Sequence, residues 1–330
     1  MKIAINGFGR IGRVILRIAL EKKLNVVAIN DPHGIEAAEY LIKHDTVYGP
    51  FKGKVSKDKD NIIINNKKIK LLSERDINKL PWKKLGVDVV IESTGVFRDR
   101  ESASIHLKNG AKKVIITSPA KKPDITIVPG VNHQKLNKDH KIISVASCTT
   151  NCLTPIVKII HDNFKIKRAL MTTVHAFTND QATHDEFHKK LRRGRAASQN
   201  IIPTTTGAAE SVVEIMPELL GKINGLAVRV PVACGSLVDL VAELEKEYSV
   251  EQINSALKKA SQKEMKGIIE YSEEELVSSD IIGNTHSSVV DAKCTQVDGN
   301  LIKVLAWYDN EWGYSNRVID VLQMISKWAR

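Results

Sequence analysis

Short apolar runs recur through the N-terminal half of the chain and alternate with stretches of helical periodicity. The runs lie at residues 3–5, 26–29, 87–91, 114–116 and 142–143. After the first run, one face of a helix is marked by the apolar side chains Ile11, Val14, Ile15 and Ile18. Continuous apolar strands joined by crossover helices are typical of a parallel sheet that is buried on both faces. The pattern therefore predicts an α/β domain.

Two further apolar runs, residues 62–64 and 69–72, flank the polar stretch Asn65-Asn66-Lys67-Lys68. Two strand-like runs separated by a short polar connection indicate a β-hairpin. We expect this hairpin to be an insertion in the parallel domain.

The pattern changes after Cys148, where longer strands with alternating polarity are predicted at residues 169–174, 226–230, 237–244 and 301–308. Such strands suit an α+β domain with a mostly antiparallel sheet, covered by helices on one face. A final helical stripe needs a partner surface and consists of Val318, Val321, Leu322, Ile325 and Trp328. We expect a first domain of residues 1–147, joined by a C-terminal helix at 314–330, and a second domain of residues 148–313.

Composition narrows the class of protein. The 330 residues include 42% hydrophobic and 26% charged side chains, which suits about two globular domains. Charged residues interrupt every apolar stretch before the ~20 residues of a membrane-spanning helix, and the strand-like start leaves no room for a targeting segment. Four cysteines are too few for a disulfide framework, so we expect reduced thiols and a cytoplasmic protein. The net charge of +11 is compatible with nucleic acid, a membrane surface or a small anionic substrate, and does not choose among them.

A glycine-rich segment, Asn6-Gly7-Phe8-Gly9-Arg10-Ile11-Gly12, follows the first predicted strand and opens the first predicted helix. This is the context that a dinucleotide-binding GxGxxG motif requires. Gly7 permits a tight turn, Gly9 permits close approach of a pyrophosphate to the helix N-terminus, and Gly12 permits close packing of helix on strand. A merely tight strand-to-helix turn is the alternative. We favour a Rossmann-type NAD-binding domain.

Asp31 ends the second predicted strand, about 20 residues beyond the glycines. A carboxylate there accepts hydrogen bonds from the adenosine ribose hydroxyls and repels a 2′-phosphate, which favours NAD over NADP. Taken alone, Asp31 before Pro32 could instead be a helix cap or a turn residue.

Cys148 follows a predicted strand and precedes a helical period at Leu153, Ile156, Ile160 and Phe164. A cysteine at a helix N-terminus meets backbone N–H groups and the positive end of the helix dipole, which favour the nucleophilic thiolate. A cysteine taken in isolation is more often a small buried hydrophobe. We expect Cys152, one turn further on, to matter less.

The segment around Cys148, ASCTTNCL, resembles the active-site signature of the phosphorylating glyceraldehyde-3-phosphate dehydrogenase family. Further similar segments, in the same order along essentially the whole chain, are INGFGRIGR, VHAFTNDQ, LRRGRAA, IIPTTTGAA, RVP and WYDNEWGYSNR. The resemblance implies oxidation and phosphorylation of D-glyceraldehyde 3-phosphate to 1,3-bisphosphoglycerate in glycolysis and gluconeogenesis. It implies NAD reduction, a Cys148 hemithioacetal and thioester, and His175 as general base. It also implies a homotetramer in which residues 176–200 form a loop near a neighbouring subunit's cofactor.

The same resemblance assigns ligand-binding residues. For the substrate's phosphate it implies Thr178 and Arg229, with Asp180 as a supporting neighbour. For inorganic phosphate it implies Ser147, Thr149, Arg193, Thr206 and Gly207. For the cofactor it implies Asn6, Gly7, Phe8, Gly9, Arg10, Ile11, Gly12, Asp31, Thr94, Gly95, Ser118, Asn179, Asn310 and Tyr314, with Asn310 and Tyr314 orienting the nicotinamide. Hydroxyls, backbone N–H groups and arginines suit phosphate. Alternatively, the threonines at 204–206 simply satisfy a strand or a turn, and Arg192, Arg193 and Arg195 form a solvated basic face.

Two departures from the family pattern stand out. Glu186-Phe187 precedes His188 where NAD-using members usually carry Leu-Pro, which leaves cofactor preference and subunit contacts less secure. Val232-Ala233-Cys234-Gly235-Ser236 replaces Thr-Pro-Asn-Val-Ser, from which we infer no change of activity. His184 and His188 would suit a metal only on a helix, and because the family has an ordered loop there we expect no metal.

Three rival interpretations remain. Erythrose-4-phosphate dehydrogenases share the glycine loop and the cysteine segment but depart from the Thr-Asn-Asp and Thr-Thr-Thr-Gly runs that this chain keeps. A nucleic-acid-binding protein would use the positive charge, but the chain lacks a basic patch interleaved with aromatic residues, so we expect no specific nucleic-acid partner. Peroxide sensing by Cys148 would be a side property of the same nucleophile.

Overall fold

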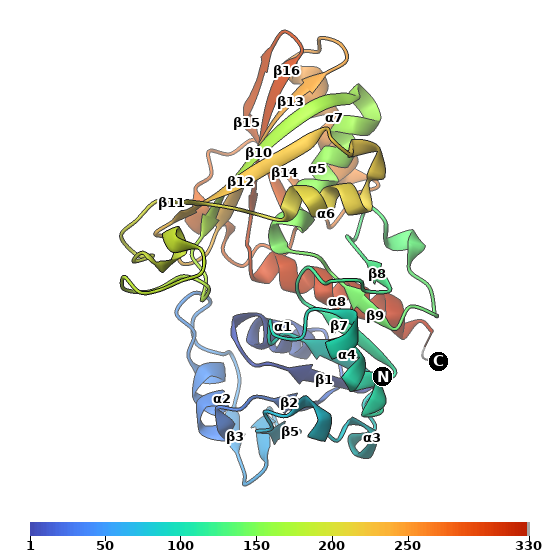
Figure 1. Ribbon diagram of the computed structural model, residues 1–330, viewed down its shortest axis with the longest axis vertical. Helices are drawn as coiled ribbons and strands as arrows, with labels where there is room; N and C mark the ends of the chain where they lie inside the picture. The colour runs from blue at the N-terminus through green and yellow to red at the C-terminus, as the bar shows by residue number, and fades with distance from the viewer. Residues whose placement is uncertain (329–330) are drawn as a thin grey trace. The chain divides into compact units, whose positions relative to one another are not determined.

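The computed structural model describes residues 1–328 and divides into two compact units (Figure 1). The first unit comprises Met1–Ile127, Asn132–Ala146 and the C-terminal segment from Ser315. The second comprises Val128–Val131 and Ser147–Tyr314. Each unit is built around one sheet.

The sheet of the first unit has nine strands in the order β3-β4-β5-β2-β1-β6-β7-β9-β8. Their bounds are β1 (Ile3–Asn6), β2 (Val26–Asn30), β3 (Val55–Lys57), β4 (Asn61–Ile64), β5 (Lys67–Leu72), β6 (Val89–Glu92), β7 (Lys113–Ile116), β8 (Ile125–Thr126) and β9 (Ile142–Ser144). All ladders are parallel except β3–β4 and β4–β5. Every residue of β1 and β6 is buried, because helices connect the parallel strands and cover them. The predicted α/β domain is confirmed.

Helical segments of the first unit are α1 (Arg10–Glu21), α2 (Gly34–Lys43), α3 (Trp82–Leu85) and α4 (Arg100–Lys108), with short 3-10 turns η1 (Ile77–Lys79) and η2 (His133–Lys135). The apolar face predicted for α1 is buried, except that Ile11 is only partly covered.

The predicted hairpin is formed by β4 and β5, but its connection is shorter than expected. Only Asn65 and Asn66 form the turn, both with left-handed φ values, 47° and 68°. Two consecutive left-handed residues match the right-handed twist of a hairpin, and asparagine tolerates this conformation well. Lys67 and Lys68 belong to β5, which also pairs in parallel with β2, so the hairpin extends the main sheet.

The sheet of the second unit has seven strands in the order β11-β12-β10-β13-β16-β15-β14. Their bounds are β10 (Ile166–Ala176), β11 (Ile202–Thr204), β12 (Ile223–Val230), β13 (Ser236–Leu244), β14 (Ile269–Ser272), β15 (Ser288–Asp298) and β16 (Leu301–Tyr308). The ladders are antiparallel except β10–β12 and β14–β15. The predicted α+β arrangement is confirmed, although β11, β14 and β15 were not predicted.

One face of this second sheet is covered by α5 (Cys148–Phe164), α6 (Ala208–Ile215) and α7 (Val250–Gln262), as Figure 1 shows. The unit also contains the 3-10 turns η3 (Leu191–Gly194), η4 (Pro217–Leu219) and η5 (Ser278–Ile281). Alternate residues of β13 are buried and partly exposed, which is the pattern of a sheet with helices on one face only.

The last helix, α8 (Trp312–Ser326), carries the predicted apolar stripe in part. Val318, Val321, Leu322 and Ile325 are buried. Trp328 does not belong to the stripe, because the helix ends before it and its side chain remains 40% exposed beside Lys113. No helix within residues 1–328 is long and apolar enough to cross a membrane.

Candidate active site

Cys148 is the first residue of α5, as the sequence predicts. Ser147 is the N-cap of this helix, and its hydroxyl accepts a hydrogen bond from the Thr150 N–H at 3.0 Å. Such a cap satisfies one of the N–H groups that a helix start leaves without an intrahelical partner. The cap therefore fixes the start of α5 and with it the position of the sulfur.

The Cys148 Sγ lies 3.4 Å from Nε2 of His175, near the end of β10. His175 Nδ1 lies 2.6 Å from the carbonyl oxygen of Ala176, to which it can only donate. This bond places the proton of the neutral ring on Nδ1 and leaves Nε2 with a free electron pair facing the thiol. Arg229 Nη1 is 3.0 Å from the same Nδ1 and donates to the same carbonyl at 2.9 Å.

The surroundings of Cys148 and His175 favour an uncharged thiol and an uncharged imidazole. Burial and the charges of Arg229 and Arg193 lower the pKa of His175 to about 3. Burial also raises the pKa of the Cys148 thiol, and the Arg229 charge and hydrogen bonds from Thr149 oppose this only in part. The expected resting thiolate is therefore not favoured. The sulfur instead has a neutral base within reach that can take its proton.

Tyr308 is a site residue that sequence reasoning missed. Its fully buried hydroxyl lies 2.9 Å from Oγ1 of Thr149 and 2.8 Å from Oγ1 of Thr173. Its ring meets the His175 ring edge-on, with the centroids 5.9 Å apart. These contacts link the first turn of α5 to β10, and they therefore help to hold Cys148 close to His175. They also direct the Thr149 hydroxyl, a predicted phosphate ligand, toward Tyr308.

The predicted substrate-phosphate residues Thr178 and Arg229 are brought together. Arg229 Nη1 lies 3.5 Å from the Thr178 hydroxyl, and the buried Arg229 Nε has no hydrogen-bond partner in the described structure. Gln181, which was not predicted, accepts from the Thr178 N–H at 3.3 Å, while its own buried amide nitrogen has no partner there. Buried donors without partners are costly, so these groups are suited to receive an anion.

The predicted inorganic-phosphate residue Arg193 is held by several protein groups. It forms an ion pair with Asp180, donates from Nε to the Thr204 hydroxyl at 3.0 Å, and donates from Nη2 to the Thr205 carbonyl at 3.0 Å. Arg195 instead pairs with an exposed carboxylate, that of Asp185.

Thr206 and Gly207 come directly before α6, and Gly207 is its N-cap. The Thr206 hydroxyl accepts from the Ala208 N–H at 3.2 Å. A Cβ at Gly207 would meet nothing within 4 Å, so the start of α6 is open to an anion.

Of the predicted nicotinamide residues, Asn310 is buried and accepts hydrogen bonds from the Gly235 N–H at 3.2 Å and the Ser236 hydroxyl at 2.9 Å. Tyr314 is buried, and burial together with the nearby Cys148 raises its pKa well above the ordinary value. Both residues belong to the second unit, as Cys148 does. Asn179, in contrast, is exposed in a turn.

The first unit contains a cavity of about 390 Å³ at the glycine loop. Six predicted cofactor residues line it, namely Asn6, Gly7, Phe8, Gly9, Asp31 and Thr94. Sequence reasoning missed other lining residues: Asn30, Pro32, His33, Glu74, Arg75, Ile77, Leu80, Ser93, Val96 and Phe97. Arg10, Ile11, Gly12, Gly95 and Ser118 do not line it. Arg10 reaches Asp45 at 2.6 Å, Gly95 adopts a φ of 73°, and the Ser118 carbonyl accepts from Ser144.

The glycine loop fits a dinucleotide. A Cβ on Gly7, whose φ is +91°, would lie 2.6 Å from the Thr94 backbone nitrogen, and one on Gly12 would lie 2.2 Å from the Gly7 carbonyl oxygen. These two glycines are required by the protein's own packing. A Cβ on Gly9 would meet nothing within 4 Å, so Gly9 opens space at the start of α1, where a pyrophosphate fits.

Asp31 links the glycine loop to the end of β2. Its carboxylate accepts from the Phe8 N–H at 2.9 Å and from the His33 N–H at 3.0 Å. It lines the cavity while making these bonds, which suits the predicted contact with a ribose.

Within residues 1–328, no group of three or more His, Cys, Asp or Glu side chains is arranged to hold a metal ion. The segment with His184 and His188 is an irregular loop. His188 lies 3.6 Å from Asp180, and Gly194 packs so closely on the loop that a Cβ would lie 2.2 Å from the Glu186 carbonyl oxygen.

Comparison with known proteins agrees with this arrangement. The family model "Glyceraldehyde 3-phosphate dehydrogenase, NAD binding domain" matches residues 1–100, and "Glyceraldehyde 3-phosphate dehydrogenase, C-terminal domain" matches residues 147–310. The chain is 54% identical over 329 residues to glyceraldehyde-3-phosphate dehydrogenase of Geobacillus stearothermophilus, covering 99% of this chain and 98% of that protein. It is 54% identical over 330 residues to the Thermotoga maritima protein of the same name, covering 99% of each. The chain therefore belongs to the glyceraldehyde-3-phosphate dehydrogenase family and is an NAD-dependent oxidoreductase.

Proposed function

We propose that this protein oxidises and phosphorylates D-glyceraldehyde 3-phosphate to 1,3-bisphosphoglycerate, with reduction of NAD, in glycolysis and gluconeogenesis. The observation that carries the proposal is the 3.4 Å approach of the Cys148 sulfur to the base nitrogen of His175. A thiol paired with an oriented imidazole is the arrangement that nucleophilic catalysis at a carbonyl requires.

In the first half of the reaction, Cys148 attacks the aldehyde carbon while His175 Nε2 takes the thiol proton. The new oxyanion is stabilised by backbone N–H groups at the start of α5 and receives this proton, which gives a hemithioacetal. His175 takes the hydroxyl proton again as the carbon loses hydride and becomes a thioester carbonyl. Bound NAD supplies the hydride acceptor, and Asn310 and Tyr314 orient its nicotinamide.

In the second half, inorganic phosphate attacks the thioester carbon and Cys148 leaves as the thiolate, which His175 reprotonates. Ser147, Arg193, Thr206 and Gly207 hold this phosphate, and Thr178 and Arg229 hold the phosphate of the substrate. The buried Nε of Arg229 and the open N-terminus of α6 support these assignments. Asp180 fixes the Arg193 guanidinium through their ion pair.

The direct test is NADH formation from glyceraldehyde 3-phosphate with and without inorganic phosphate. We expect steady turnover only with phosphate, and a single burst of NADH, about one per subunit, without it. Erythrose 4-phosphate and NADP, assayed in parallel, should be poorer substrates. Faster oxidation of erythrose 4-phosphate would instead favour the rival dehydrogenase.

The covalent step predicts that Cys148→Ser lowers turnover by about a thousandfold or more, because an alcohol is a far weaker nucleophile than a thiolate. NADH binding, measured by fluorescence titration, should be kept. Cys294→Ser is the control, since Cys294 is a free cysteine of β15 that is not among the proposed site residues, and the change should leave turnover unaffected. Near-normal turnover in Cys148→Ser would show that the covalent mechanism is wrong.

The Asp31 carboxylate predicts the cofactor choice. Asp31→Asn keeps an acceptor for the Phe8 N–H but removes the charge that would repel a 2′-phosphate, whereas Asp31→Ala removes both. We expect both variants to raise the ratio of kcat/KM for NADP to that for NAD by about tenfold or more. An unchanged ratio in Asp31→Asn would contradict the role of charge.

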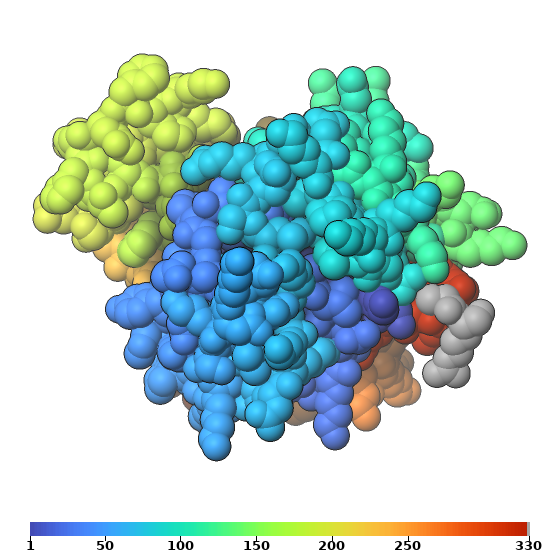
Figure 2. Space-filling model, turned by 90° about the horizontal axis from the view of Figure 1, so that it is seen from below, coloured from blue at the N-terminus to red at the C-terminus, as the bar shows by residue number. Residues whose placement is uncertain are grey.

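We also propose that the protein is a homotetramer. One face of the second sheet carries exposed leucines on three of its strands: Leu170 on β10 is 67% exposed, Leu226 on β12 is 45% exposed and Leu301 on β16 is 43% exposed. Exposed apolar patches of this kind mark interfaces. The loop at residues 176–200, whose yellow-green atoms gather together in Figure 2, exposes Phe187 and Leu191 and is proposed to approach a neighbouring subunit's cofactor. A cytoplasmic location is proposed because the reaction needs a reduced Cys148, and all four cysteines are free thiols.

A further inference from the structure

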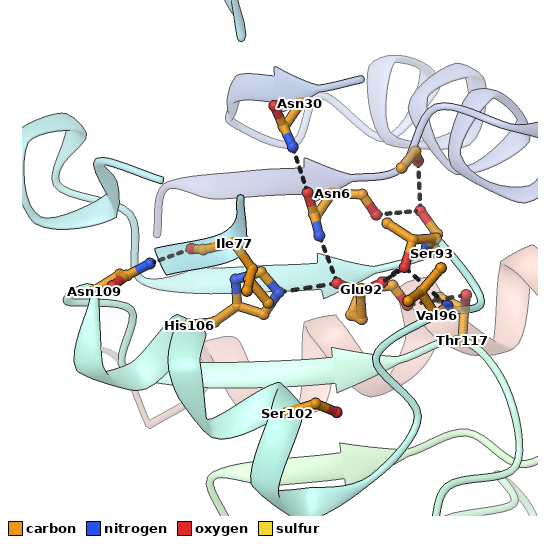
Figure 3. Close-up of polar contacts among 12 residues, drawn as sticks. Asn6, Asn30, Ile77, Glu92, Ser93, Val96, Ser102, His106, Asn109 and Thr117 are labelled. Carbon is orange, nitrogen blue, oxygen red and sulfur yellow. Dashed lines mark hydrogen bonds and ion pairs between the residues drawn. The ribbon is translucent and has the colours of Figure 1, made fainter. Parts of the chain in front are cut away.

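A carboxylate is buried at the end of β6, beneath the cofactor cavity. Glu92 is 2% exposed, and both of its oxygens accept hydrogen bonds (Figure 3). Oε2 accepts from Asn6 Nδ2 at 2.6 Å and from His106 Nε2 at 2.9 Å. Oε1 accepts from the Thr94 N–H at 2.8 Å and from the Thr94 hydroxyl. None of these groups takes part in the reaction proposed above, except that Asn6 and Thr94 line the cavity.

On one side, the direction of the hydrogen bonds is fixed by Trp82. Its indole N–H can only donate, and it donates to Nδ1 of His106 at 2.9 Å. His106 Nδ1 therefore carries the free electron pair and Nε2 carries the proton. Trp82 and His106 are both completely buried, and the hydrogen bond from the indole holds the imidazole as a donor to Glu92.

On the other side, the direction is fixed by the backbone of Glu74. Its N–H donates to Asn30 Oδ1 at 3.0 Å, and its carbonyl accepts from Asn30 Nδ2 at 3.0 Å. Asn30 Nδ2 also donates to Asn6 Oδ1 at 2.8 Å, which leaves Asn6 Nδ2 to donate to Glu92. Both chains of hydrogen bonds thus end on Glu92, which has only acceptors to offer when ionised.

The charge of Glu92 acts on the cavity through Thr94. The Thr94 hydroxyl donates to Glu92 and accepts from the Val96 N–H at 3.1 Å. Thr94, Val96 and Phe97 all line the cavity. Glu92 therefore holds the loop of residues 94–97 in the conformation that shapes one wall of the cofactor site.

We propose that Glu92 is a positioning residue for NAD: its buried carboxylate, kept as an acceptor by the Trp82–His106 and Asn30–Asn6 chains, sets the loop 94–97 for cofactor binding. The inference rests on the proposed function, because it assigns this cavity to NAD.

The test compares Glu92→Gln and Thr94→Val with the wild type. A glutamine offers one oxygen and one NH₂ group where the carboxylate offers two oxygens. Either the donors of Asn6 and His106 or those of Thr94 would then face the NH₂ group, which is itself a donor. We expect the Kd for NADH and the KM for NAD to rise by about 10- to 100-fold in each variant. In Glu92→Gln, turnover at saturating NAD and the rate of Cys148 alkylation by iodoacetamide should stay within about threefold, a split that general destabilisation would not give.

Two variants serve as controls. Thr94→Ser keeps the hydroxyl and should bind NADH nearly as the wild type does. Thr117→Val removes a hydroxyl that donates to the main-chain oxygen of Glu92 at 3.2 Å, and it should change the Kd less than about twofold. Should Glu92→Gln fail to fold, the contrast between Thr94→Ser and Thr94→Val still decides the matter.

A double-mutant cycle completes the test. If Glu92 acts through the Thr94 hydroxyl, the Kd of the double variant for NADH should be little higher than that of the single variant that binds NADH less tightly. Wild-type affinity in Glu92→Gln, or fully additive losses, would overturn the inference while leaving the proposed function intact. A wild-type protein that bound no NADH would refute both.

Discussion

The state of His175 depends on a single neighbouring atom. The Ala176 carbonyl oxygen accepts the Nδ1 proton at 2.6 Å, so the nitrogen that faces Cys148 is the basic one. Arg229 donates to the same carbonyl, and its positive charge disfavours a second proton on the ring. The arginine that we propose to bind the substrate phosphate thus also keeps the imidazole neutral, with Nε2 unprotonated.

His175→Asn should make the free energy of unfolding less sensitive to acid. The pKa of His175 is lowered from 6.5 to about 3, so between these values the unfolded chain binds a proton that the folded chain does not. Stability therefore falls as pH decreases through this interval. Removing the group should reduce the loss of unfolding free energy between pH 7.5 and pH 4.5 by roughly 2–3 kcal/mol.

Urea unfolding at fixed protein concentration, at both pH values, measures this difference. Asparagine can replace Nδ1 as a donor to the Ala176 carbonyl, which limits other losses. If wild type and variant lost stability equally on acidification, the ring would not be held neutral by its surroundings.

Among the elements, the turn from β1 to α1 shows how similar glycines serve different purposes. Gly12→Ala should lower the unfolding temperature by several degrees, because its Cβ would collide with the Gly7 carbonyl oxygen at 2.2 Å. Gly9→Ala should leave the unfolding temperature nearly unchanged, since its Cβ meets no protein atom within 4 Å. It should nevertheless weaken NADH binding by about tenfold or more, because the methyl group would occupy the space proposed for the pyrophosphate.

Thermal unfolding and NADH titration of the two variants separate these roles, and each variant serves as the control of the other. Strong destabilisation by Gly9→Ala, or unimpaired NADH binding in it, would contradict the assignment of Gly9 to the cofactor.

The elements also show what the sequence could and could not predict. Strands with a continuous apolar run, such as β1 and β7, and strands that alternate, such as β13 and β16, were predicted because their burial follows their polarity. Strand β15 was missed because it buries polar residues, including Asp291 and Thr295, and β11 was missed because it spans only Ile202–Thr204 and contains a proline. Short strands and buried polar residues depend on tertiary partners that no local pattern reveals.

The residues of the candidate site can likewise be divided into those that the sequence predicted and those that it did not. Cys148 and His175 were predicted because they lie in segments that resemble a known family. Tyr308 lies in the similar segment WYDNEWGYSNR but was not predicted, because its hydroxyl contacts Thr149 across 159 positions of the chain, and the Glu92 network joins residues up to 86 positions apart. Family resemblance predicts residues that contact ligands, whereas the hydrogen bonds that orient them appear only once the chain is folded.

At the scale of the whole molecule, the two faces of the second sheet differ in the side chains that they carry. Its inner face packs on α5, α6 and α7 and supports Cys148 and His175. Its outer face carries leucines and the ion pairs Arg168–Glu243 and Lys303–Asp239. Because interfaces combine an apolar core with a polar rim, leucines together with ion pairs are compatible with the interface proposed above.

Leu170→Asp should therefore dissociate the proposed tetramer. If the outer face is the interface, an aspartate at position 170 would be buried without a partner on assembly, which costs several kcal/mol and should raise the subunit dissociation constant by at least about 100-fold. Sedimentation velocity over a range of concentrations measures this shift. Lys259→Asp is the control, because it places the same side chain on the exposed surface of α7, on the opposite side of the sheet. An unchanged distribution of species in Leu170→Asp would exclude the outer face as the interface, and the exposed leucines would then need another explanation.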